Sequence, residues 1–255
     1  MGKLLKLLTI CCMFVFVIIQ NVSAGSMGSQ ESTRNYLKNG EFTLQLGGFW
    51  RNAGAEQFIG IQDLIGDRFT VTNGSDFNGL FGVGYFLNAK NYARVNTALG
   101  LNWFYLPRTA VSGTVIQEDL FPNLLYQYNI TNYPLYVVAK AMIDTLSPGR
   151  QITLNAGIGP NFMRMSRFSE TSITQTLAFS SEPQAFFSSK TVTNFSATAG
   201  VGILLKHVFG DAPLACGYQF FYLGEGRFNI ANDQLINTLK TGQMYANAAV
   251  CSIHI

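Results

Sequence analysis

The chain has 255 residues, with 17 Lys and Arg against 14 Asp and Glu, and charged residues make up only 12% of it. That share is about half of what soluble domains carry, while aromatic residues reach 13%. A soluble protein of this size normally needs a more charged surface, and the near balance of charge argues against binding to nucleic acid. The four cysteines form no CxxC motif or Cys/His cluster, so we expect no metal site and no cofactor.

The N-terminus has the three parts of a secretory signal peptide. Lys3 and Lys6 form a charged start, residues 7–19 an apolar core, and Val22-Ser23-Ala24 a small-residue cleavage site. The apolar core is shorter than the roughly 18 residues of a spanning helix, which argues against a retained anchor. The expected divisions are a signal peptide at 1–24, a polar periplasmic lead-in at 25–40 and a membrane barrel at 41–255.

Eight segments of the mature chain alternate apolar and polar residues, as strands with two different faces do. In the clearest, KTVTNFSATAGVGILLK, every second residue from Thr191 to Leu205 belongs to a mostly apolar face. A helix would need a 3.6-residue period and would tolerate Gly200 and Gly202 poorly. A tilted strand crosses a bilayer with about 9–11 residues, so these segments can span one. The expected strands are 41–50, 78–87, 92–106, 123–143, 152–165, 190–206, 215–228 and 243–255.

The connections between these strands alternate long and short, as in outer-membrane barrels with long extracellular loops and short periplasmic turns. Pro107 is expected to end the third strand, and Pro134 predicts a bulge within the fourth, because proline cannot donate to the ladder. Residues 233–240, DQLINTLK, are compatible with a helical turn. The long connections are 51–77, 107–122, 166–189 and 229–242.

These features predict an all-β fold, an eight-stranded antiparallel up-and-down transmembrane β-barrel. In lipid only helices and closed barrels satisfy every backbone group, and we find no further candidate for a spanning helix. Aromatic residues gather near the strand ends, where an interfacial girdle is expected. They are Phe49, Trp50, Trp103, Phe104, Tyr105, Tyr126 and Phe162.

Three stretches resemble one protein family: FSATAGVGILL at 195–205, the aromatic CGYQFFYLGEGRF at 216–228, and the C-terminal strand. In them the chain is similar to the OmpA/OmpX-like, opacity-protein-related surface antigens of Gram-negative bacteria. The resemblance implies an eight-stranded outer-membrane barrel, with adhesion or host-surface contact through its outer loops. Family members usually end on an aromatic residue that the barrel assembly machinery reads, whereas here Ile255 ends the alternation.

The polar residues of the alternating segments are expected to face the lumen. An eight-stranded barrel is just wide enough inside to be filled by side chains, so charges there must pair or meet water. The set is either a structural plug or a narrow, gated ion conduit, with Phe86, Phe104 and Phe221 filling the rest of the lumen. Its expected members are Glu41, Gln45, Arg94, Asn96, Asn102, Lys140, Asn155, Asn161, Lys206, Gln219, Glu225 and Arg227.

The mature chain contains two histidines, His207 and His254, and Ser252 shares a strand face with His254. Outer-membrane lipid A deacylases use a His/Ser pair. Strand parity turns this face inward, however, and places it near the periplasm, where such a pair is typical of solvated lumen residues. We therefore expect no catalytic residues and no enzyme.

Cys216 and Cys251 are expected on one face, near the periplasmic rim of two neighbouring strands. Directly opposed residues have Cβ atoms about 4.5–5.5 Å apart and a disulfide needs roughly 3.5–4.5 Å, so only the right register permits a bond. The oxidising periplasm allows a disulfide without requiring one. The pair is either a disulfide or two separate thiols packed against lipid.

The sequence thus predicts a surface protein with a structural or adhesin-like interaction role, located in the bacterial outer membrane. The alternative is a small porin or narrow ion conduit. A soluble lipocalin-like barrel would carry Lys and Glu outside, whereas the outward set here is Val, Leu, Phe, Ala and Thr. The expected partners are outer-membrane lipid, the barrel assembly machinery and a host or cell-surface ligand.

Overall fold

The computed structural model describes residues 40–92, 94–173, 183, 186–209 and 212–255. The expected signal peptide and, apart from Gly40, the expected lead-in lie outside these residues. Within the described ranges, no helix has the length and apolar character that crossing a membrane requires.

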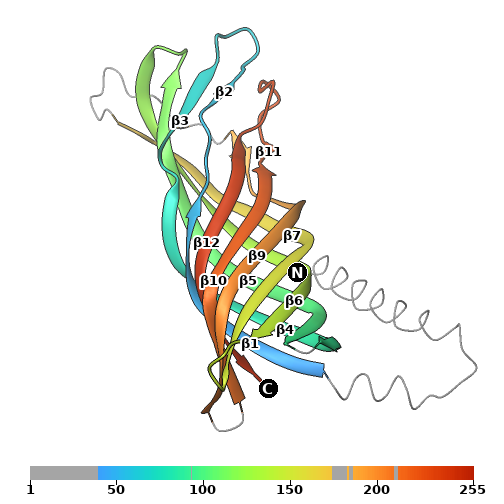
Figure 1. Ribbon diagram of the computed structural model, residues 1–255. Coiled ribbons are helices and arrows are strands. Elements are labelled where there is room, and N and C mark those ends of the chain that lie inside the picture. The colour runs from blue at the N-terminus through green and yellow to red at the C-terminus, as the bar shows by residue number, and fades with distance from the viewer. Residues whose placement is uncertain (1–39, 93, 174–182, 184–185, 210–211) are drawn as a thin grey trace, which may run out of the picture. The chain divides into compact units, whose positions relative to one another are not determined.

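In this part of the chain, eight long antiparallel strands pair around a closed ring (Figure 1). The ladder order is β6-β7-β9-β10-β12-β1-β4-β5, and a further β5–β6 pairing joins its two ends. Ring neighbours follow one another along the chain, so the barrel is up-and-down, as predicted. The strands are β1 (Gly40–Asn52), β4 (Ser75–Tyr92), β5 (Val95–Gln117), β6 (Phe121–Asp144), β7 (Arg150–Ser172), β9 (Lys190–Phe209), β10 (Ala212–Arg227) and β12 (Lys240–His254).

Four shorter strands of the described chain lie outside this ring, within stretches that the sequence predicts as loops. β3 pairs with β2 and with the last part of β5, and β11 pairs with β8. Figure 1 shows β2, β3 and β11 at one end of the barrel, which we call the extracellular end. The short strands are β2 (Gln57–Ile59), β3 (Asp67–Asn73), β8 (Phe187–Ser188) and β11 (Asn229–Ile230).

Most barrel strands extend further toward the extracellular end than expected, β5 and β7 by the most. β5 runs to Gln117 and β6 starts at Phe121, so the expected loop at 107–122 shrinks to residues 118–120. β7 likewise continues to Ser172. The helical turn considered at 233–240 is absent, because these residues form a turn and an isolated bridge.

Pro107 and Pro134 behave differently from the prediction. Pro107 does not end β5, because one extra β5 residue between Leu106 and Thr109 shifts the register with β6 and accommodates the proline. Pro134 makes no bulge, since it pairs with Asn161 within one unbroken β6–β7 register. The bulge therefore lies on the neighbouring strand.

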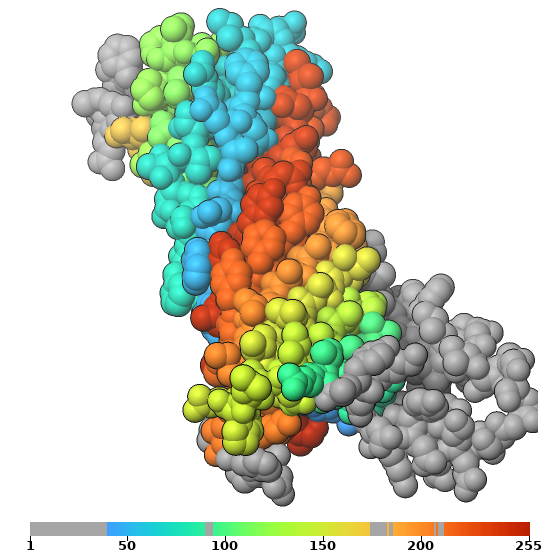
Figure 2. Space-filling model, viewed as in Figure 1, coloured from blue at the N-terminus to red at the C-terminus, as the bar shows by residue number. Residues whose placement is uncertain are grey.

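The outer face of the ring is apolar over its periplasmic half and middle. Figure 2 shows this face on β9, β10 and β12, where the side chains lie in diagonal rows. So much exposed apolar surface is unfavourable in water, and a closed barrel leaves no strand edge for lipid to meet, so the band is built to face lipid. Its most exposed members include Leu46, Leu99, Val137, Ile158, Val201 and Ile203.

A girdle of aromatic side chains bounds this band on the extracellular side. Each barrel strand contributes to it from its outward face, and register places Phe81 opposite Tyr105 and Tyr222 opposite Tyr245. The rings of Tyr105 and Tyr133 stack at 5.3 Å. Such belts mark the membrane–water interface. The girdle comprises Trp50, Phe81, Tyr105, Tyr133, Phe162, Phe195, Tyr222 and Tyr245.

Three aromatic residues expected at the interface lie elsewhere. Phe49 and Phe104 are buried inside the barrel, and Tyr126 is buried inside the wall beyond the girdle. They have the opposite strand parity to the girdle residues, so closeness to a strand end does not by itself fix the face.

Candidate functional site

The periplasmic end of the lumen holds a closing cluster of Glu41, Lys140, Ser252 and His254. His254 is 2% exposed, and its Nδ1 is hydrogen-bonded to the Glu41 carboxylate. Its Nε2 lies 3.1 Å from Ser252 Oγ and 3.5 Å from Lys140 Nζ. Because Thr43 pairs with His254, the cluster spans the seam where the first and last barrel strands meet, and β6 adds Lys140.

These contacts reproduce the serine–histidine–carboxylate order of a hydrolase triad. The cavity that Ser252 lines, however, has a volume of about 60 Å³, which is room for about two water molecules and not for an acyl substrate. Lys140 also shares the Nε2 that would have to accept the serine proton. The cluster is therefore suited to holding strands together.

Above the closing cluster lies an amide layer of Gln45, Asn102, Asn155 and Gln219. Gln45 Nε2 donates to Asn102 Oδ1 at 3.1 Å, and Gln219 Nε2 donates to Asn155 Oδ1 at 3.0 Å and also contacts Thr198 Oγ1. All four were expected in the lumen, and the structure brings them together as two pairs, each of which reaches across one intervening strand, β4 or β9. Their mutual bonds satisfy polar groups that would be costly to bury alone.

An aromatic layer of Phe104, Tyr136 and Phe221 fills the lumen next, whereas Phe86 lies on the periplasmic side of the amide layer. Phe104 packs edge-on against Phe221 at 5.0 Å, and Tyr136 lies 6.2 Å from Phe221. Lys140 Nζ sits 5.3 Å from the centre of the Phe86 ring. The three phenylalanines were expected in the lumen, and each is at most 4% exposed.

Two further members of the expected lumen set lie at opposite ends. Asn161 is fully buried, and its Nδ2 donates to Asn132 Oδ1 and to the Leu223 carbonyl, both at 2.9 Å. Asn96 is half-buried on the inward face near the periplasmic rim. The side chain of His207 lies outside the described part of the chain.

Arg94 and Lys206 were expected in the lumen but lie at the periplasmic rim. Arg94 is exposed in the turn before β5, where its carbonyl accepts the Asp144 N–H at 2.9 Å. Lys206 Nζ is 3.7 Å from Asp144 Oδ1, and both side chains are more than 40% exposed. Here the barrel ends, so residues of inward parity reach water.

Glu225 and Arg227 were also expected inside, and the structure turns both outward. Gly224 has a φ of +81°, and the β10–β12 register shifts there by one residue. A one-residue bulge moves every following side chain to the other face. Gly226 and Phe228 are consequently buried, and Arg227 is exposed.

Cys216 and Cys251 are direct cross-strand partners with Cα atoms 4.1 Å apart, and the structure joins them in a disulfide. Both lie on the outward face that also carries Tyr218 and Ile253. Of the two states left open by the sequence, the bonded one is therefore the one present. It ties β10 to β12 next to the closing cluster.

Beyond the girdle the barrel wall continues as an extracellular extension, formed by β2, β3, β8, residues 108–132 and 164–172 of the long strands, and residues 228–239 with β11. Its interior is aromatic, with ring centroids 5.1–6.5 Å apart. Val111, Val115 and Leu124 are fully buried beside these rings. The rings are those of Phe69, Tyr126, Phe168, Phe187 and Phe228.

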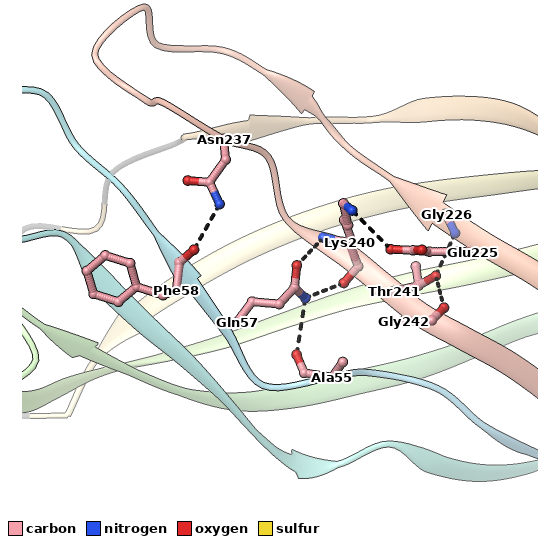
Figure 3. Close-up of polar contacts among 9 residues, drawn as sticks. All are labelled: Ala55, Gln57, Phe58, Glu225, Gly226, Asn237, Lys240, Thr241 and Gly242. Atoms are coloured by element: carbon pink, nitrogen blue, oxygen red, sulfur yellow. Dashed lines mark hydrogen bonds and ion pairs between the residues drawn. The ribbon is translucent and has the colours of Figure 1, made fainter.

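The first and fourth outer connections hold each other (Figure 3). Gln57 Nε2 donates to the Lys240 carbonyl at 2.6 Å, and the Lys240 N–H donates to Gln57 Oε1 at 2.9 Å. Asn237 Nδ2 donates to the Phe58 carbonyl at 2.8 Å. Ile236 adds a backbone bond to Gly60. These reciprocal bonds fix the two loops in one arrangement.

The outermost turns of the extension expose large apolar side chains. Two turns meet there, because Glu118 Oε2 accepts the Ile65 N–H at 3.1 Å and Arg68 pairs with Asp119. Burial raises the pKa of Asp67 in the adjoining strand. The exposed apolar side chains, each between 58% and 69% accessible, are Leu64, Ile65, Leu120, Phe121 and Ile236.

No family model and no curated protein matches the chain. Among solved structures it is similar to neisserial surface protein A, at 11% identity over 84% of this chain and 96% of that one, with a TM-score of 0.38. It is also similar to OprG of Pseudomonas aeruginosa, at 13% identity, 85% and 96% coverage and a TM-score of 0.43. The protease OmpT of Escherichia coli gives 7% identity, 84% and 95% coverage and a TM-score of 0.46. These values assign no function or residue role to this chain.

The described residues form a transmembrane β-barrel of the outer-membrane type, as the closed ring, the apolar band and the girdle require. Sequence patterns locate most of the lumen residues, because polar side chains alternate with lipid-facing ones. They do not reveal the partnership of Glu41 with His254, which are 213 positions apart. The extracellular core was also missed, although alternating valines at 111 and 115 were a signal for it.

Proposed function

We propose that this protein is a surface protein of the bacterial outer membrane whose extracellular extension is an adhesin-like binding structure for a host or cell-surface ligand. The observation that carries the proposal is the tip, defined by Leu64, Ile65, Leu120, Phe121 and Ile236. These apolar side chains stand exposed on turns that a packed core and reciprocal hydrogen bonds hold in place.

Apolar side chains on the outermost turns are unfavourable in water unless a partner covers them. Their placement on a pre-organised support lowers the entropy that a binding partner would have to overcome. Turns without such a support would lose this advantage. The aromatic core and the loop clamp therefore have a role in binding as well as in stability.

The lumen gives no comparable support to the porin alternative. The aromatic layer crosses it with rings 5.0–6.4 Å apart, and the cavity beneath that layer has a volume of about 60 Å³. We assign the lumen polar residues a structural role. Assembly would follow export by the signal peptide and insertion by the barrel assembly machinery.

Cell binding by the protein in nanodiscs tests the proposal. Beads carrying the wild-type protein are expected to adhere to cultured epithelial cells. A variant with Leu64→Ser, Leu120→Ser and Phe121→Ser should lose most of that adhesion, because it removes the apolar surface and leaves the support intact.

Leu146→Ser is the matched control, since Leu146 is 96% exposed in a turn at the periplasmic end. It should bind as the wild type does. Equal adhesion of the tip variant and the wild type would contradict the proposal. Steady wide-pore currents from the pure protein in planar bilayers would favour the porin instead.

A further inference from the structure

A cavity opens in the barrel wall where β9 and β10 separate. Their ladder extends up to the pair Tyr222–Ala197, just before the Gly224 bulge. Beyond that point β9 still pairs with β7, and β10 still pairs with β12. The seam cavity between them has a volume of about 350 Å³. Its lining residues are Val192, Thr193, Asn194, Glu225, Gly226, Arg227 and Lys240.

The charges of this lining are unbalanced. Arg227 and Lys240 are direct cross-strand partners, an arrangement that repels when both are cations. Glu225 Oε1 lies 3.6 Å from Lys240 Nζ, and Figure 3 shows this contact beside Gly226. Among the described residues, Arg227 has no carboxylate within 4 Å. The cavity therefore has room for an anion that neutralises the second cation.

Arg227 supplies hydrogen-bond donors to the cavity, because it lines the cavity and its side chain is exposed. Arginine binds phosphate with two parallel hydrogen bonds, so Arg227 favours an oxyanion over a halide.

The position of the cavity relative to the membrane indicates which molecules can reach it. The girdle residues on the same three strands are Phe195, Tyr222 and Tyr245, whose rings lie 5.6–6.4 Å apart. The residues that line the cavity lie next to them on the extracellular side. Thr193, Arg227 and Lys240 follow on the outward, exposed face. Groups just above an aromatic belt meet lipid headgroups, below the tip of the extension and above the acyl chains.

We propose that the seam cavity binds the phosphate of a phosphorylated lipid headgroup in the outer leaflet. This assignment rests on the proposed outer-membrane location and is independent of the adhesin-like role. A phosphate group presents two oxygens to the planar guanidinium of Arg227 and neutralises the cation that Glu225 leaves without a carboxylate partner. Glu225 holds Lys240 in position and restricts the cavity to one such group.

Lipid retention by the whole protein in zwitterionic detergent tests the assignment. The probes are lipid A with its phosphates, the same lipid after dephosphorylation, and inorganic phosphate, with bound lipid counted by native mass spectrometry. Wild type should retain lipid A about tenfold better than the Arg227→Gln and Lys240→Gln variants, the loss expected for one charge-assisted hydrogen bond. Lys206→Gln makes the same charge change at the periplasmic rim and should retain lipid as the wild type does.

Equal retention by wild type and Arg227→Gln would overturn the assignment, as would equal retention of the dephosphorylated lipid. If inorganic phosphate at equal concentration displaced lipid A, the cavity would be a site for free anions. That result would overturn the claim that the bound phosphate belongs to a lipid. Heat-modifiable gel mobility confirms that each variant is folded. Lipid retention by the tip variant should be unchanged, so failure of this assignment and failure of the adhesin-like role are separable.

Discussion

The membrane band and the extracellular extension share strands but differ in their interiors and in their outer faces. Within the band the lumen combines polar layers, as at Lys140, with buried aromatic rings, and the outer face is apolar, as at Val137. Farther along the same strand β6, Tyr126 and Tyr128 are buried inside and Gln127 is exposed outside. The inward and outward faces keep their directions, and the solvent outside changes from lipid to water.

The comparison shows that lipid or water outside the wall determines which residue types occupy each face. It also shows that the strand register shifts where lipid gives way to water. Register shifts lie close beyond the girdle, between Leu106 and Thr109 in β5 and between Tyr222 and Gly224 in β10. Bulges re-aim side chains, so they allow one wall to change from a polar to an apolar lining.

The largest expected effect comes from truncating one buried ring in each region. Phe221→Ala in the band and Phe228→Ala in the extension should each cost about 3–5 kcal/mol, because both rings are almost fully buried. Phe221→Ala should lower the urea midpoint of the whole barrel. Phe228→Ala should instead open the extension to limited proteolysis while the barrel keeps its heat-modifiable mobility. A barrel midpoint lowered equally by both changes would show that the regions unfold as one.

A charge on the outer face of β6 should separate the two regions more sharply. Val137→Arg places a cation near the middle of the lipid band and should cost about 2–4 kcal/mol. Gln127→Arg makes a similar change on the same face of the same strand, in water, and should stay within about 0.5 kcal/mol. Unfolding in urea from lipid vesicles measures both. An equal loss of unfolding free energy in both variants would mean that the two positions face the same solvent, which would contradict the comparison.

The closing cluster should have a smaller effect, confined to the band. His254→Ala leaves the Glu41 carboxylate and the Lys140 ammonium without their shared partner, and should cost about 1–3 kcal/mol. Ser252→Ala removes only one hydroxyl contact and should be nearly neutral. The urea midpoint measures both variants, and an unchanged midpoint for His254→Ala would rule out its structural role.

The smallest expected effect is a pH dependence of the extension. Burial raises the pKa of Asp67 above its ordinary value of 3.8, so the folded state favours the neutral carboxyl. The resulting stability is complete below the unfolded pKa and is lost as pH rises through the raised folded pKa. Asp67→Asn should flatten this dependence in protease-protection curves and keep an acceptor for the Glu118 N–H. An identical slope in the variant would exclude Asp67 as its source.

The sequence predicts the band well because lipid and lumen impose opposite chemistries on alternate residues. The segments 95–103 and 195–205 therefore show both their strand character and their outward face. The amide layer follows from the same parity, as Gln45 and Asn102 illustrate. No bulge interrupts these segments, so the alternation of residues is sufficient to assign each side chain to the inner or the outer face.

The extension could not be predicted in the same way. Its outer face is polar, so the stretch with Ser112 and Thr114 reads as a loop, although these two residues alternate with buried Val111 and Gly113. The bulge at Gly224 then reversed the expected direction of Glu225 and Arg227. A single inserted residue leaves no mark in the period-two pattern, and only the pairing register reveals it.

The most direct test of the account is solvent accessibility along the outward face of β6. Nitroxide labels placed singly at Val137, Leu135, Gln127 and Leu125, with Cys216 and Cys251 changed to Ala, report collisions with oxygen and with a water-soluble nickel chelate. The account predicts oxygen-dominated collisions at the first two positions and chelate-dominated collisions at the last two, with the crossover at the Tyr133 girdle. Chelate access to all four positions, or to none, would contradict a wall that passes from lipid into water.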